Sequence, residues 1–146
     1  MSLLGKAFGK GSILLNQKAA NWQEAVRLAG DCLVASGCTT AKYTDAMIAT
    51  ISELGPYVVI APGLAMPHAR PNESVLHTGM SLITLAEPVD FGSSNDPVRV
   101  VFALAARDHD KHLELLSEFA GKASDANFVN SLLSCPTEAQ IRTLIH

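Results

Sequence analysis

The run Arg99-Val-Val-Phe-Ala-Leu-Ala-Ala106 decides how this chain folds. After its first residue the run is entirely apolar, and it ends at the charged residues Arg107 and Asp108. A strand with no polar face must be covered on both sides, as the central strands of α/β proteins are. The run therefore predicts the middle strand of a sheet that lies between two layers of helices.

Helical patterns follow this strand up to the C-terminus. The next helix is predicted to begin at Asp108 or Asp110, and its inward face is predicted to consist of four residues at helical spacing: Leu113, Leu116, Phe119 and Ala120. Two shorter helices are predicted at 125–134 and 137–145. The second of these begins with the capping-box spacing of a threonine and a glutamine three residues later.

Strands and helices also alternate before the central run, without a linker or a repeat. Short strands are predicted at 12–16, 57–60, 64–66 and 79–85. One helix is predicted to begin after Asn21, with Glu24 at capping-box spacing, and to end at Gly37. Another is predicted at 40–54, stopped by Gly55-Pro56. The expectation is one domain over residues 1–146, a layered α/β fold with a mixed β-sheet and helices on both faces.

Composition excludes several classes of function. The 146 residues are 48% hydrophobic and carry a net charge of −3 without a basic run, which argues against nucleic acid or an anionic membrane as a partner. The apolar runs are too short to span a bilayer, and residues 1–15 are broken by glycine and lysine, so no signal peptide is expected. Cys32, Cys38 and Cys135 form no Cys-x-x-Cys pair. Free thiols and a cytoplasmic location are therefore predicted.

The candidate functional residue His68 lies in a second stretch, Gly55-Pro-Tyr-Val-Val-Ile-Ala-Pro-Gly-Leu-Ala-Met-Pro-His-Ala-Arg70. Pro67 favours an extended Met66, so the chain should reach His68 rigidly and from a strand. Ala69 leaves room beside the imidazole for a bulky group. A histidine presented in this way suits proton transfer, metal ligation or acceptance of a phosphoryl group.

This stretch resembles the phosphohistidine signature of the fructose/mannitol-type enzyme IIA proteins of the bacterial phosphoenolpyruvate-dependent sugar phosphotransferase system. Glu53, Ile60, Ala61 and the segment 64–69 fill its constrained positions, and residues 55–71 are similar to the ascorbate-specific branch in particular. The resemblance implies an α/β layered fold and a phosphoryl acceptor at His68. It implies that Nε2 takes the phosphoryl group while the other ring nitrogen donates to a carbonyl.

The resemblance also implies partners. His68 would take its phosphoryl group from the histidine-containing phosphocarrier protein and give it to a cysteine of a cognate IIB protein. Through IIB it would serve a IIC membrane permease, here for ascorbate uptake, with neither metal nor organic cofactor. A flat apolar patch around Pro62, Gly63, Leu64 and Met66 is expected to dock both protein partners in turn.

Two further residues are candidates for binding the phosphoryl oxygens. The family carries a second active-site histidine before an apolar helix start, and His112-Leu113 matches that position, with His109 as the competing choice. Arg70 should point the same way as His68 in an extended segment, and its guanidinium suits a phosphate. Many mannitol-type relatives carry their useful arginine upstream, where this chain has Ser52-Glu53, so a surface role for Arg70 stays open.

Two other functions stay open at this point. A metal-dependent hydrolase would use His68, His109, Asp110 and His112, although the chain has no His-Glu-x-x-His motif. A regulatory protein of the same fold would be phosphorylated as a signal, as the nitrogen-related members of the family are. His77 and His146 are assigned no role.

Overall fold

A single five-stranded sheet forms the centre of the computed structural model, which describes residues 3–145 and, for Leu3, the main chain only. The strands lie in the order β1-β4-β5-β3-β2: β1 (Ile13–Gln17), β4 (Gly79–Val89), β5 (Val98–Ala105), β3 (Leu64–Ala65) and β2 (Val59–Ala61). β1 and β4 are parallel, as are β3 and β5, whereas β4 with β5 and β2 with β3 are antiparallel. The predicted mixed sheet and its central strand are confirmed.

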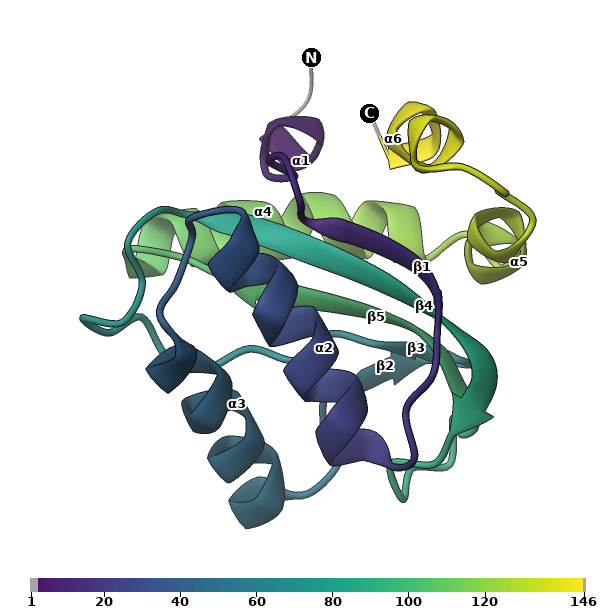
Figure 1. Cartoon of the computed structure of the whole chain (residues 1–146), viewed down its shortest axis with the longest axis horizontal. Helices are drawn as coiled ribbons and strands as arrows, with labels where there is room; N and C mark the ends of the chain where they lie inside the picture. Colours follow the sequence, from purple (N-terminus) through teal and green to yellow (C-terminus); the bar gives the residue numbers. More distant parts are fainter. Residues whose placement is uncertain (1–2, 146) are drawn as a thin grey trace.

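Helices cover both faces of this sheet, as predicted (Figure 1). One face carries α2 (Trp22–Ala35) and α3 (Ala41–Leu54). The other carries α1 (Leu3–Lys6), α4 (His109–Ala123), α5 (Phe128–Leu133) and α6 (Glu138–Ile145). α1 is a single turn that the glycine- and lysine-rich start of the sequence did not predict. His146 lies outside the described residues.

The alternation of side chains along β5 explains why its sequence has no polar face. Successive side chains of a strand point to opposite faces. Val101, Ala103 and Ala105 enter the core beneath α2 and α3, and Val100, Phe102 and Leu104 enter the core beneath α4, α5 and α6. All six are fully buried, so each face of the strand removes apolar surface from water.

Side-chain caps begin three of the helices where the sequence indicated. At the start of α6, the Thr137 hydroxyl accepts from the Gln140 amide (3.3 Å). The Asn21 carboxamide accepts from the Glu24 amide (3.0 Å), although the Glu24 carboxylate accepts from the amide of Ala20. Asp108, rather than Asp110, caps α4, because its carboxylate accepts from the Lys111 amide at 2.8 Å. An ionised carboxylate at this position is further stabilised by the positive end of the helix dipole.

The inward face of α4 differs from the predicted one. Leu115 and Phe119 are buried, whereas Leu113 is 51% exposed and Ala120 is also exposed. Leu113 precedes Leu115 by two residues, which is about 200° of rotation around a helix, so the two cannot share a face. His112 instead falls on the side of Leu115 and Phe119.

The strands of the signature stretch are shorter than predicted, while β4 is longer. β2 begins at Val59 rather than residue 57, β3 ends at Ala65, and β4 continues to Val89. None of the helices formed within residues 3–145 has the length and apolar character needed to cross a membrane.

Candidate functional site

His68 lies just beyond the end of β3, beside β5. The Leu104 amide donates to the carbonyl of Pro67 (3.0 Å), and His68 and Leu104 form an isolated parallel bridge. Because β3 and β5 are parallel, their C-terminal ends lie at the same edge of the sheet. The chain that leaves β5 enters α4, which brings His112 to the edge where His68 lies. Carboxyl ends of parallel strands are the usual place for a site in such folds.

The main chain of His68 is held on its other side by a buried tyrosine. The Tyr43 hydroxyl accepts from the Ala69 amide (3.0 Å) and donates to the Leu104 carbonyl (2.7 Å). The sequence predicted Tyr43 only as an inward-facing residue of α3, because helical spacing shows burial but not hydrogen bonds.

The His68 ring is half-buried and oriented by its own main chain. Nδ1 lies 2.9 Å from the carbonyl oxygen of Met66. A carbonyl only accepts, so Nδ1 carries the proton and Nε2 keeps its lone pair. This is the tautomer that a nucleophile at Nε2 requires.

A second tyrosine lies against His68 and was missed from the sequence. The ring of Tyr57 meets the imidazole edge-on, with centroids 5.6 Å apart at 85°. Its hydroxyl lies 3.4 Å from the carbonyl of His68, and the residue is 42% exposed. The sequence feature that could have pointed to Tyr57 is its place in the Gly55-Pro56-Tyr57 turn, at the start of the stretch that contains His68.

His112 is the histidine that the fold brings to His68. The two ring centroids lie 5.3 Å apart at 60°. Burial, followed by the charges of His68 and His109, lowers the pKa of His112, so this imidazole is neutral near pH 7. Its Nδ1 is buried and has no hydrogen-bond partner among the described residues. The single proton of the neutral ring is therefore best placed on Nε2, where a ligand can accept it.

Comparison with known proteins identifies the family of the chain. Over residues 6–146 the sequence matches the family described as "Phosphoenolpyruvate-dependent sugar phosphotransferase system, EIIA 2". The chain belongs to this family. It is 41% identical over 136 residues to the ascorbate-specific PTS system EIIA component of Escherichia coli K12, covering 92% of this chain and 88% of the relative.

Solved EIIA structures share its fold. A putative PTS IIA domain from Streptococcus pyogenes has a TM-score of 0.89 and 35% identity, covering 99% of this chain and 96% of that one. Enzyme IIAMTL of Escherichia coli, solved in complex with phosphorylated enzyme IIBMTL, has a TM-score of 0.82 and 28% identity, covering 94% and 95%.

Two other predicted site residues of this EIIA chain, Arg70 and His109, are exposed. The guanidinium of Arg70 makes no hydrogen bond or ion pair within residues 3–145. His109 is the exposed first residue of α4, and the ring that pairs with His68 is that of His112. The role of Arg70 stays a prediction.

The predicted docking patch of the EIIA chain was wrong in part. Leu64 and Met66 are buried, because β3 pairs with β5 and places their side chains in the core beneath α4. The large apolar residues exposed near the site are Tyr57, Ile60 (43%) and Leu113. Beside them a groove of about 370 Å³ is lined by Ile60, Ala61, Met66, Leu116, Phe119, Ala120, Ala123 and Ser124.

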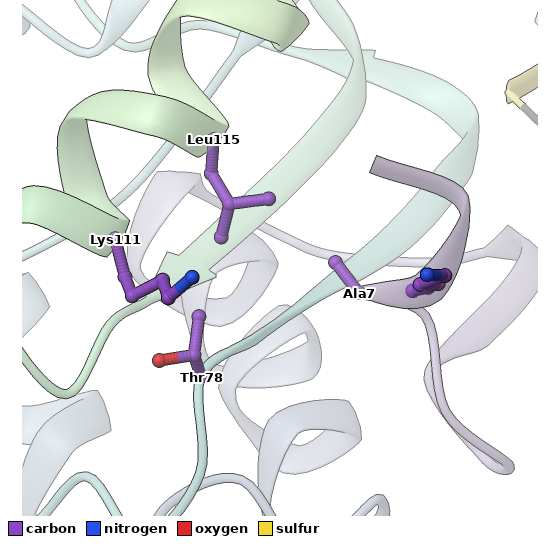
Figure 2. A pocket seen from close by; sticks show the side chains of 5 residues that line it. Ala7, Thr78, Lys111 and Leu115 are labelled. Atoms are coloured by element: carbon purple, nitrogen blue, oxygen red, sulfur yellow. The ribbon is translucent and has the colours of Figure 1, made fainter. Parts of the chain in front are cut away.

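A smaller cleft of about 210 Å³ lies between α1, α4 and the start of β4 (Figure 2). It is lined by Lys6, Ala7, Thr78, Lys111 and Leu115, and includes neither histidine of the site. Figure 2 shows the Lys111 amine reaching toward Thr78.

The metal alternative lacks its ligand cluster in this EIIA fold. Across residues 3–145, no three His, Cys, Asp or Glu side chains gather where they could hold a metal ion. His68, His109, Asp110 and His112 therefore do not converge as a zinc-dependent hydrolase would need.

Proposed function

We propose that this EIIA chain carries a phosphoryl group on Nε2 of His68. The group comes from the histidine-containing phosphocarrier protein and goes to a cysteine of a cognate IIB protein. The observation that carries the proposal is the contact between Nδ1 of His68 and the Met66 carbonyl (2.9 Å), which leaves Nε2 as the nucleophile beside His112.

The chemistry is two in-line displacements at phosphorus. In the first, the Nε2 lone pair of His68 forms a bond to phosphorus while the donor's N–P bond breaks and its electron pair returns to the donor imidazole. In the second, the IIB thiolate attacks the phosphorus and the His68 imidazole leaves. The protein contributes position and charge stabilisation more than covalent chemistry. The N–H of neutral His112, and the guanidinium of Arg70, would bind the equatorial oxygens.

The relatives support the choice of partner and of transported substrate. The similar IIAMTL forms a complex with phosphorylated IIBMTL, which supports a IIB protein as the acceptor. The curated relative named above is an ascorbate-specific EIIA component, so we assign this chain to an ascorbate system with a IIC permease, acting in the cytoplasm. The exposed side chains of Tyr57, Ile60 and Leu113 offer an apolar surface for docking beside the histidines. A purely regulatory role is the alternative.

Intact-mass measurement tests the proposal. Incubation with phosphoenolpyruvate, enzyme I and the phosphocarrier protein should add one phosphoryl group to the wild type and to His109→Ala. His68→Ala should take none and should keep its fold, because the ring is half-buried and packs outside both apolar cores. A labelled His68→Ala would contradict the assignment. Labelling of the wild type without transfer to any IIB protein would favour the regulatory role.

A further inference from the structure

A buried hydroxyl stands at the junction between the phosphoryl acceptor and the central strand. Tyr43 lies in the first turn of α3 and is fully buried. Its hydroxyl contacts the Ala69 amide (3.0 Å), the Leu104 carbonyl (2.7 Å) and, more distantly, the Ala69 carbonyl (3.2 Å). It has one proton, and the shortest contact shows that Leu104 is its main acceptor.

The Tyr43 hydroxyl takes part in the parallel bridge between His68 and Leu104. In such a bridge, Leu104 would donate to the residue before His68 and accept from the residue after it. The first bond is direct, from the Leu104 amide to the Pro67 carbonyl (3.0 Å). The second runs through the Tyr43 hydroxyl, which receives the Ala69 N–H and passes its own proton to the Leu104 carbonyl. β3 itself ends at Ala65 and cannot hold His68 in this position.

We propose that Tyr43 is a positioning residue for phosphoryl transfer: its hydroxyl fixes the main chain of His68 relative to β5, the strand that leads into α4 and His112. The inference rests on the proposed function of His68. Within residues 3–145 the Tyr43 hydroxyl forms no hydrogen bond with either histidine ring, so it acts through the main chain of Ala69 and Leu104.

The protonation of Tyr43 supports this role. Burial raises the pKa of the Tyr43 hydroxyl to about 12, so the group stays protonated and donates throughout the neutral range. Replacement by phenylalanine would keep the ring in the core but leave the Ala69 amide and the Leu104 carbonyl without their shared partner. The segment 68–70 would then move to close a direct bond or admit water. Either change alters the placement of His68 against His112.

The test compares Tyr43→Phe with a matched control, Ser81→Ala. The Ser81 hydroxyl is also fully buried and donates to a main-chain carbonyl, that of Ala29 at 2.7 Å, but it does not contact the His68 segment. Both variants are phosphorylated, and their transfer to IIB is measured at a temperature at which both are folded. Tyr43→Phe should lower kcat by up to about 10²-fold, the cost of a misplacement near 1 Å. Its KM for IIB should be unchanged, because Tyr43 does not reach the surface.

Two results would overturn the inference: a Tyr43→Phe rate within twofold of wild type, or an equal loss in Ser81→Ala. If Tyr43→Phe does not fold, amide exchange at Ala69 in the wild type decides. The relayed bond predicts a protected amide, and exchange at the rate of an open loop contradicts it. A wild type that takes no phosphoryl group would refute the function of His68, whereas normal transfer in Tyr43→Phe refutes only the role of Tyr43.

Discussion

The rings of His68 and His112 lie against one another edge-on, with 5.3 Å between their centroids, although the two residues follow different strands. Burial, followed by the charges of His68 and His109, lowers the pKa of His112. His112 is therefore neutral near pH 7 and offers an N–H, while Nδ1 of His68 donates to the Met66 carbonyl, as the tautomer with a lone pair on Nε2 requires.

His112→Ala should still accept a phosphoryl group but should pass it on slowly. Removing one donor that stabilises the transferring group commonly lowers the rate by about 10²–10³-fold. Phosphorylated His112→Ala mixed with IIB should therefore accumulate in a rapid-quench measurement. His109→Ala is the control and should react at the wild-type rate. The opposite pattern would assign the role to His109.

Arg70→Ala should slow transfer if the guanidinium binds the phosphoryl oxygens. A hydrogen bond to a charged group is worth about 1.5–3 kcal/mol, so the loss should be about 10- to 10²-fold. Arg70→Lys should recover only part of it, because an ammonium cannot bind two oxygens as a fork. The control is Arg27→Ala, whose exposed ion pair with Asp45 lies on α2 and α3. Equal rates in all four proteins would make Arg70 a surface residue.

Leu113→Ser should weaken docking of IIB without weakening the fold. Leu113 is 51% exposed, so its replacement removes little buried area from the domain. A central interface residue commonly costs more than about 1 kcal/mol when truncated, which here means a KM at least about fivefold higher. Leu54, which is 66% exposed at the far end of α3, supplies the control variant Leu54→Ser. An unchanged KM in Leu113→Ser would move the docking surface elsewhere.

The stability of the domain should fall as the pH drops below about 6.5, partly because of His112. Its folded-state pKa is lowered from 6.5, so the unfolded chain binds more protons in the window below 6.5. Stability then rises with pH through this window and is fully present above it. Urea unfolding on both sides of pH 6.5 should show a shallower pH dependence for His112→Gln than for the wild type. Parallel curves would show that His112 titrates normally.

Transfer should be faster to an ascorbate-type IIB than to fructose- or mannitol-type IIB proteins. Under the proposed function His68 passes on a phosphoryl group without contacting the sugar, so partner choice would come from shape and charge around residues 55–71. Stopped-flow rates with the three IIB proteins decide this. Equal rates, or a preference for the mannitol-type protein, would leave the phosphocarrier role intact and remove the ascorbate assignment.

The sequence predicted those features that depend on local pattern. The uninterrupted apolar run at β5 gave the central strand, and Asn21 and Asp108 marked helix starts, because caps and strand burial are written in neighbouring residues. His68 and His112 were predicted together because a family pattern contains them.

Features that depend on tertiary packing were not predicted. Leu113 is apolar yet faces solvent, and Met66 is buried although it belongs to the signature loop. The spacing of apolar residues along α4 did not show which of its rows of side chains would pack against the sheet. The hydrogen bonds of the Tyr43 hydroxyl join residues from α3, β5 and the loop after β3, a convergence that exists only in the folded chain.

The anchoring of His68 on both sides has a consequence for the order of events. A histidine tied through Pro67 and Ala69 to the central strand cannot swing from one partner to another. Under the proposed function, its phosphoryl donor and its acceptor would therefore occupy the same face of the domain at different times, each leaving before the other arrives. The two partners would then compete for one surface. An excess of unphosphorylated phosphocarrier protein would inhibit transfer to IIB, and an excess of IIB would inhibit phosphorylation of His68.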